Sequence, residues 1–390
     1  MRSFFVKSVL VLFGSIFVYT AYATDLSVRI FSDRSYAKMK MTTVLGNYKI
    51  LDGQGQFIAD LSTNESVIME VNNQKINLYN DGKSMGSYSN ISFDGEGLKA
   101  IFCLSPEPSK KGQERYYDDH LEVSVEAASL FLINVVDLEN YVAGVVQSEV
   151  RGISDKPDFY KIQAIISRTY AMNNLKKHIQ DGYNLCDDVH CQVYKSRNNM
   201  PIILTATVQT AGKVLVDSGN HIITASFYSN SGGETVNSED VWNLETSYLK
   251  SIVDTFSLSM KNAKWQKIMP KMEWLRFLKK TYNYNIDNVM MRDSALSFSQ
   301  ETRKVYFCGQ IPLKYIRRDL NLRSTFFSVT CDGETVILNG KGYGHGVGLS
   351  QEGAVKMVDF GYSVEDVIRF YYTGASIKDV DELPTDDLGD

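Results

Sequence analysis

The hydrophobic pattern of the first hundred residues predicts short strands. Between residues 25 and 104, apolar runs such as LSVRIF, SVIMEV and INLYN alternate with polar stretches. The turn sequences NDG at 80–82 and DG at 94–95 separate these runs, as they do in antiparallel sheets. We therefore predict a small β-rich region over residues 24–104. The polar segment 105–119 contains two prolines and is expected to form a loop or a domain boundary.

The pattern then becomes mixed. Alternating apolar residues at 121–125 and the run LFLINVV from Leu130 predict two strands. Asp137 is a suitable N-cap for a short helix, LENYVAGVV. A second helix is expected to begin near Asp158, after a proline, and to end at Gly182. Strands and helices in this order predict an α+β fold.

A candidate acid/base group lies between these two helices. Glu149 follows the first helix in a turn of small residues, and Lys161 and Arg168 share one face of the second. Positive charge lowers the pKa of a carboxyl group and burial raises it, so such a cluster can bring the pKa close to neutrality. An ordinary surface cluster, in which the two cations solvate the helix face, is the alternative interpretation.

Strand-like patterns return after Pro201, in ILTATVQT, KVLVDSG and HIITASFYS. They lead to the polar turn SNSGG at 229–233, beside Tyr228, which either connects strands or binds a polar ligand through its amides and hydroxyl groups. Residues 264–282 are predicted to be helical on both sides of Pro270, with a solvated basic face.

The run GKGYGHGVGLSQEGA is the most distinctive motif of the last third. Glycine occupies every second position from 340 to 348, around His345. Such glycines allow positive φ and close approach of the backbone to a partner. The spacing matches neither a dinucleotide-binding fingerprint nor a phosphate-binding loop. Ser350 is expected to cap a helix that Gly361 ends, which delivers His345 to a helix N-terminus, where anions are favoured.

A further helix is predicted before VIRFYY, because Ser363 and Asp366 have capping-box spacing. The acidic tail, residues 379–390, is expected to be disordered.

Composition narrows the functional classes. The chain has 390 residues, which allows two domains or one large one. Its 23 tyrosines and 19 phenylalanines suit β-rich packing and surfaces on which sugars stack. The net charge of −5 gives no reason to expect a nucleic-acid partner.

The N-terminus predicts export. Arg2 and Lys7 precede an apolar run, and Ala21-Tyr22-Ala23 has the small-x-small pattern that signal peptidase recognises. We predict a signal peptide over residues 1–23 and a location in the periplasm or cell envelope. An uncleaved membrane anchor is the alternative, although the apolar run is shorter than the ~20 residues that span a bilayer.

Three residues that commonly bind metals lie within a six-residue stretch. Cys186, His190 and Cys191 could hold zinc if His178 or a water completed a tetrahedron. A disulfide between Cys186 and Cys191 is the alternative in an exported protein. The chain has five cysteines, so at least one is unpaired, metal-bound or joined to another chain.

Six motifs, in order, resemble the SpoIID/LytB family of cell-wall proteins: LENYVAGVVQSEV, KIQAIISRTYA, CQVY, FYSNSGGET with VW after it, LNLRSTFF and GYGHGVGLSQEGA. The resemblance implies a groove-bearing catalytic core over residues 120–378. It also implies a lytic transglycosylase that cleaves peptidoglycan strands already stripped of stem peptides and leaves 1,6-anhydro-muramoyl ends. Residues 25–104 carry no family motif, and the helix motif is bulkier here than the usual KAQAVAARTYAL.

The family's catalytic glutamate corresponds to Glu149. The other matched positions are expected to contact substrate: Lys161, Arg168, Gln192, Tyr194, Tyr228, Ser231, His345 and Gln351. Lys161 and Arg168 would hold the lactyl carboxylate or orient the acid, and His345 would line the groove. Some members of the family bind zinc beside the QVY motif, which resembles Cys186, His190 and Cys191. No cofactor is required for the reaction, and a structural zinc is the one expected addition.

Two other functions remain open from the sequence. One is a non-catalytic glycan-binding module that positions or activates a cell-wall amidase. The other is a zinc hydrolase that uses the Cys/His cluster.

Overall fold

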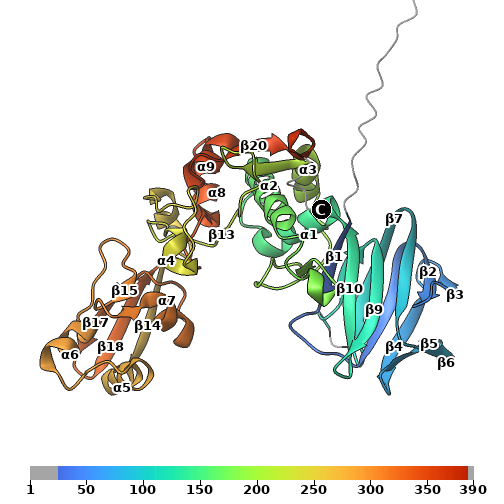
Figure 1. Cartoon of the computed structure of the whole chain (residues 1–390), viewed down its shortest axis with the longest axis horizontal. Helices are drawn as coiled ribbons and strands as arrows, with labels where there is room; N and C mark the ends of the chain where they lie inside the picture. Colours follow the sequence, from blue (N-terminus) through green and yellow to red (C-terminus); the bar gives the residue numbers. More distant parts are fainter. Residues whose placement is uncertain (1–24, 110, 385–390) are drawn as a thin grey trace, which may run out of the picture.

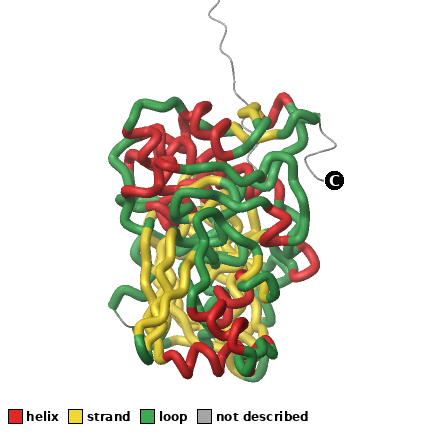
Figure 2. Tube along the Cα trace, turned by 90° about the vertical axis from the view of Figure 1, so that its left-hand side faces the viewer, coloured by secondary structure: helices red, strands yellow, loops and turns green. Residues whose placement is uncertain are grey.

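The computed structural model describes residues 25–109 and 111–384, so the predicted signal peptide, residues 1–23, lies outside the described residues. The α+β class and the β-rich N-terminal region are confirmed. The N-terminal sheet lies at one end, a group of helices lies in the middle, and a smaller lobe lies at the other end (Figure 1). Figure 2 shows most helices in the upper half of the molecule. Among the described residues, no helix is both long enough and apolar enough to cross a bilayer.

The N-terminal sheet has the order β11-β1-β10-β9-β7-β2-β4-β5-β6, with β3 paired to β2 and β8 paired to β7. Its strands are β1 (Asp25–Ile30), β2 (Lys38–Asp52), β3 (Phe57–Leu61), β4 (Ser66–Asn72), β5 (Lys75–Asn80), β6 (Lys83–Tyr88), β7 (Ile91–Pro106), β8 (Arg115–Asp118), β9 (His120–Glu126), β10 (Ser129–Asp137) and β11 (Leu185–Cys186). Residues 105–119 contain the end of β7 and all of β8, which pair in this sheet, so the segment is only partly a loop and does not separate domains.

The central helices cover the end of this sheet. They are α1 (Leu138–Val150), α2 (Pro157–Asn173), α3 (Pro201–Gln209), α8 (Gln351–Asp359) and α9 (Val364–Tyr371). Helix α2 packs against each of the other four helices and against the strand β12, and its apolar face joins the main core. Beside them, β12 (Lys213–Val216) pairs with β20 (Ser376–Asp379).

Several predicted boundaries of this region are wrong. Helix α1 continues through Glu149, and α2 ends at Asn173, nine residues before Gly182, which instead caps the short 3₁₀ helix η1 (Ile179–Asp181). Lys156, not Asp158, is the N-cap of α2. ILTATVQT forms helix α3, not a strand, because Pro201 at its first turn suits a helix start and a short apolar run fits either element.

The smaller lobe is inserted between β13 (Phe227–Tyr228) and β19 (Leu349–Ser350), which pair in parallel. The lobe has its own core, which includes Trp274 and Phe307. Its main elements are β14 (Lys264–Pro270), α5 (Lys271–Tyr282), α6 (Val289–Leu296), β15 (Tyr306–Phe307), β16 (Ile311–Pro312), α7 (Leu313–Asp319), β17 (Phe327–Asp332) and β18 (Thr335–Lys341). The segment before Pro270 is therefore a strand and not the predicted helix, since it pairs with β18 along its whole length.

Both C-terminal capping predictions are confirmed. The Ser350 hydroxyl accepts a hydrogen bond from the Gly353 amide at the start of α8, and Ser363 with Asp366 forms the capping box of α9. The acidic tail is ordered at its start, because β20 and the 3₁₀ helix η3 (Val380–Glu382) include its first residues. Residues 385–390 lie outside the described residues.

Candidate functional site

Glu149 lies in the last turn of α1 and is partly exposed. Its Oε1 accepts a hydrogen bond of 3.0 Å from the Val193 amide. Burial raises the pKa of the Glu149 carboxyl group, and the bond from Val193 opposes that shift. The carbonyl end of a helix also disfavours a negative charge. Among the described residues, no lysine or arginine forms an ion pair with Glu149, so its surroundings favour the protonated acid.

The loop that carries Val193 is fixed against α1. The Ser148 hydroxyl accepts a hydrogen bond of 3.1 Å from the Lys195 amide and donates one of 2.8 Å to the Gly144 carbonyl. A Cβ at Gly144 would lie 2.4 Å from the Tyr194 ring, so only glycine allows this approach. Gly144 and Ser148 on α1 therefore hold the loop so that the Val193 amide points at Glu149.

The sequence predicts that Tyr194 and Gln192 contact substrate, but both side chains are buried and stabilise the loop from within. Tyr194 is fully buried, and its hydroxyl donates a hydrogen bond of 3.0 Å to Asn134 Oδ1 in β10. Gln192 is buried too, and its Oε1 accepts a hydrogen bond of 3.3 Å from the Tyr141 hydroxyl. Both positions are closed to a glycan by the core around them.

The predicted cluster of Glu149 with two cations is also wrong. Arg168 is fully buried and binds both carboxylate oxygens of Glu139, at 2.7 and 2.5 Å. Lys161 forms an ion pair of 2.9 Å with Asp158, three residues earlier on the same helix. Arg168 thus lies too deep in the protein to hold a substrate carboxylate, and Lys161 has a partner of its own.

Asp187 is a buried anchor that the sequence analysis missed. Its carboxylate accepts hydrogen bonds from the amides of Phe31 and Ser32, at 2.8 and 3.0 Å, and pairs with Arg115 at 2.8 Å. These partners all lie in or next to the N-terminal sheet, so Asp187 ties the site loop to that sheet. Nothing in the sequence distinguishes Asp187 from its neighbour Asp188, which forms no such contact.

The Cys/His cluster does assemble. One potential ligand atom from each of His178, Cys186, His190 and Cys191 lies within 4.8 Å of the others. His190 Nδ1 is 3.8 Å from the Cys186 sulfur and 3.9 Å from the Cys191 sulfur. The hydrogen bond with Cys191 lowers the pKa of the Cys186 thiol to about 5. The same contact, together with burial, raises the pKa of Cys191.

The ligand types of this cluster suit zinc, and its ligand atoms, which lie within 4.8 Å of one another, would have to draw together slightly around the ion. Zn–S bonds of about 2.3 Å and Zn–N bonds of about 2.0–2.1 Å in a tetrahedron place ligand atoms roughly 3.3–3.8 Å apart. His178 Nδ1 lies 3.1 Å from Asp181 Oδ2, while its buried Nε2 has no hydrogen-bond partner. A carboxylate on one ring nitrogen of a histidine is the usual support for a metal on the other.

His345 fixes the glycine loop through both ring nitrogens. Nε2 donates to the Phe227 carbonyl at 3.0 Å, and Nδ1 accepts from the Val347 amide at 3.1 Å. Burial lowers the pKa of His345 to about 4, so the ring is neutral near pH 7. The ring lies between Tyr228 and Trp242, at centroid distances of 5.2 and 5.3 Å. Both ring nitrogens are therefore occupied, and only the carbon atoms of the ring remain for contact with a ligand.

The remaining predicted contacts are buried. The Ser231 hydroxyl lies 2.7 Å from an Asp254 carboxylate oxygen and 2.6 Å from the Ser257 hydroxyl. Tyr228 is 5% exposed, and Gln351, 6% exposed, donates to Gln163 on α2 at 3.5 Å. These side chains hold the SNSGG turn and α8 in place. The sequence predicts that Ser231 contacts a ligand, but its hydroxyl is buried among protein partners.

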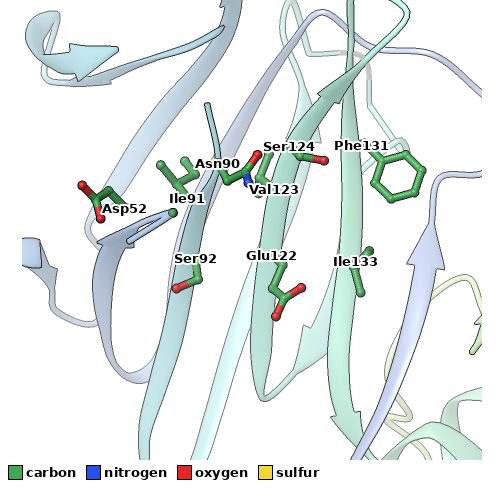
Figure 3. A pocket seen from close by; sticks show the side chains of 10 residues that line it. Asp52, Asn90, Ile91, Ser92, Glu122, Val123, Ser124, Phe131 and Ile133 are labelled. Carbon is green, nitrogen blue, oxygen red and sulfur yellow. The ribbon is translucent and has the colours of Figure 1, made fainter. Parts of the chain in front are cut away.

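A cavity of about 330 Å³ opens on the N-terminal sheet, away from these motifs (Figure 3). The carboxylates of Asp52 and Glu122 and the ring of Phe131 line it. None of the site residues predicted from the sequence is among its lining residues.

The arrangement defines an α+β protein with one helix-borne acid beside a Cys/His cluster. The SpoIID model, described as "Stage II sporulation protein", matches residues 126–216. Stage II sporulation protein D of Bacillus amyloliquefaciens is 31% identical over 299 residues, which cover 70% of this chain and 84% of that protein. Its Bacillus subtilis counterpart is 29% identical over 303 residues, 72% of this chain and 85% of that protein. The chain belongs to the SpoIID family.

A third relative has a different name. The "Amidase enhancer" of Bacillus subtilis is 27% identical over 287 residues, which cover 60% of this chain and 40% of that longer protein.

Proposed function

We propose that the protein is an exported lytic transglycosylase that cleaves peptidoglycan glycan strands lacking stem peptides, with Glu149 as its general acid and base. The observation that carries this proposal is the state of Glu149: a partly exposed carboxyl group whose pKa is raised by burial and which has no cationic partner among the described residues. Such a group is protonated over a wider pH range than a free glutamate, as a general acid requires. Membership of the SpoIID family and the likeness to an amidase enhancer support a cell-wall role.

A single carboxyl group suffices for this reaction. Most glycosidases use two, one to protonate the leaving oxygen and one as nucleophile or as base for water. In a lytic transglycosylase, the 6-hydroxyl of the muramoyl residue attacks its own anomeric carbon, so no water enters. Glu149 donates its proton to the glycosidic oxygen as that bond breaks. The resulting carboxylate, steadied by the Val193 amide, then accepts the proton of the 6-hydroxyl.

Glu149→Gln tests the proposal because glutamine keeps the shape of glutamate but cannot donate this proton. We expect release of anhydro-ended fragments from stripped strands to fall roughly 100- to 10,000-fold, the usual contribution of a general acid. Mass spectrometry of the products, with circular dichroism of both proteins, measures the effect. Glu126→Gln, an exposed change in β9, is the matched control.

The identity of the products decides between reactions. Anhydro ends indicate a transglycosylase, and reducing ends indicate a hydrolase. Undiminished release of anhydro fragments by a folded Glu149→Gln protein would refute the role of Glu149.

We also propose a structural zinc held by His178, Cys186, His190 and Cys191. Four protein ligands leave no open position for water, which is the pattern of structural and not catalytic zinc and argues against a zinc hydrolase. The metal would brace the loop between Cys186 and Val193. Elemental analysis should find one zinc per chain in the native protein and none in Cys191→Ser. Native protein with no zinc and no free thiol at Cys186 and Cys191 would instead indicate the disulfide.

The second candidate is a glycan-binding protein that activates a cell-wall amidase. The likeness to the amidase enhancer favours it. It predicts binding to glycan strands with no fragments released, together with faster hydrolysis by an added amidase. The product analysis above separates it from the transglycosylase, because only the enzyme produces anhydro ends.

A further inference from the structure

The inserted lobe carries a charge opposite to that of the rest of the chain. Residues 264–341 contain 14 lysines and arginines and seven acidic residues, a net charge of +7, whereas the whole chain has a net charge of −5. Within the described part of this lobe, only Lys279 and Arg318 form ion pairs, with Asp287 and Asp319. Most of the positive charge of the lobe is therefore not neutralised by ion pairs, although several of its cations, Arg303 among them, donate to protein oxygens.

Part of this charge surrounds a polar cavity of about 360 Å³ between the start of β14 and the segment before β17 (lobe visible in Figure 1). Its lining residues are Lys264, Trp265, Gln266, Lys267, Asn321, Leu322 and Arg323. Lys264 and Arg323 are exposed, and neither forms an ion pair with any residue that the structure describes, so their charges face the cavity without a counter-charge. The third cation, Lys267, already has a partner, because its ammonium group donates a hydrogen bond of 2.7 Å to the Leu320 carbonyl.

The walls of the cavity are held in place. Trp265 Nε1 donates a hydrogen bond of 3.0 Å to the Ser324 hydroxyl, which in turn donates one of 2.6 Å to the Lys341 carbonyl. The indole ring is half-buried and thus offers a fixed apolar surface beside the cations. Cationic groups next to a rigid aromatic ring suit a ligand that combines a carboxylate with an apolar sugar face.

The cavity adjoins the glycine loop. The Arg323 guanidinium lies 5.5 Å from the centre of the Tyr343 ring, and the Arg323 carbonyl accepts a hydrogen bond of 2.9 Å from the Gly344 amide. Tyr343 is 44% exposed, and so is Trp242, the aromatic neighbour of His345. Exposed rings therefore continue from the cavity toward His345, on the loop that the family resemblance assigns to the glycan groove.

We propose that Lys264 and Arg323 bind lactyl carboxylates of the glycan strand and make the protein select strands that have lost their stem peptides. This inference rests on the proposed function. An intact strand carries the lactyl group as a neutral amide, whereas a stripped strand exposes a carboxylate on every second sugar. Arg168 cannot bind that carboxylate because it is buried against Glu139. Lys264 and Arg323 are free cations that can.

The test is binding of stripped strands to the full chain with the Glu149→Gln substitution, so that bound strands are not cleaved. Adding Lys264→Gln and Arg323→Gln should weaken binding roughly tenfold at low salt, and less as salt rises, because exposed charges are screened. Lys279→Gln with Lys280→Gln, on α5 of the same lobe, removes the same charge and should change binding less than twofold, about the limit of detection.

Chemical reduction of the lactyl carboxylates to alcohols provides the decisive substrate. Strands treated in this way should bind the protein weakly and equally with or without Lys264 and Arg323. Unchanged binding of native strands by the double variant would overturn the inference. So would an equal loss with reduced strands, or a loss seen with poly(glycerol phosphate) but not with glycan.

These outcomes are separate from the fate of the proposed reaction. If the wild-type protein released no anhydro ends but the double variant still lost carboxylate-dependent binding, the reaction would fail and the binding surface would remain. If anhydro ends formed and binding did not depend on Lys264 and Arg323, the proposed reaction would stand and the binding surface would be refuted.

Discussion

Helix α1 carries two glutamates, one near each end, in opposite electrostatic surroundings. Glu139 lies in the first turn, where the helix dipole favours negative charge, and it binds buried Arg168 through both oxygens. Glu149 lies in the last turn, where the dipole disfavours negative charge, and a single backbone amide contacts it. The first belongs to a structural ion pair, and the second is a carboxyl group whose pKa is raised by burial.

The missing counter-charge is the feature that supports Glu149, and not Glu139, as the proposed general acid. A pairing of Glu149 with Arg168 would have lowered the pKa of the carboxyl group and kept it ionised. Arg168 instead pairs with Glu139. Glu149 has no such partner, and burial raises the pKa of its carboxyl group. Experiments that disturb one end of α1 should therefore affect stability, and those that disturb the other should affect catalysis.

Arg168→Met should have the largest effect on stability. It leaves Glu139 without its partner, and we expect a loss of about 3 kcal/mol in the free energy of unfolding, near the low end for a broken buried pair because Glu139 is partly exposed. Urea unfolding measures the change. Adding Glu139→Leu should restore part of the loss, since no unpaired charge then remains. A loss below about 0.5 kcal/mol, the size expected for an exposed ion pair, would contradict a stabilising role of the pair between Arg168 and Glu139.

The pH dependence should distinguish Glu149 from Glu139. Because folding raises the pKa of Glu149, its contribution to stability is full below the unfolded pKa and is lost as the pH rises through the folded pKa. Wild-type stability should therefore fall relative to Glu149→Gln over that window. Activity should fall in the same window, as the acid loses its proton. A constant difference between the two proteins from pH 4 to pH 8 would contradict the raised pKa, and exposed Glu122→Gln serves as control.

Tyr194→Phe should have the smallest effect. It removes the hydrogen bond to Asn134 and keeps the buried ring, so we expect a loss of about 1 kcal/mol in unfolding free energy. The KM for stripped strands should not change, because the hydroxyl is closed to substrate. A several-fold rise in KM with unchanged stability would restore Tyr194 to the substrate contacts that the sequence predicted.

The sequence predicted the parts of this molecule that depend on local chemistry. Capping by Ser350 and Ser363 and the meeting of His178 with Cys186, His190 and Cys191 follow from short-range spacing. Helix α3 was missed because nine residues of mostly apolar character fit a strand as well as a helix.

Long-range partners could not be predicted. The seven-residue spacing of Lys161 and Arg168 places both on α2, but only the packing of α2 against α1 shows that Arg168 reaches Glu139. Burial of Tyr194 and Ser231 likewise depends on elements distant in the sequence. A sequence motif identifies positions under constraint. Only the folded structure shows whether a given side chain faces a ligand or packs inside the protein.

The anchor at Asp187 limits how this protein can be divided. Its carboxylate is bound by Phe31, Ser32 and Arg115, so a truncated chain that began at residue 120 would lose all three hydrogen-bond partners and keep only Lys195, 3.6 Å away, as a counter-charge. The segment that bears the family motifs is thus not a portable module. Fusion proteins and minimal enzymes derived from it need the N-terminal sheet, which completes the loop beside Glu149 although it supplies none of the motifs.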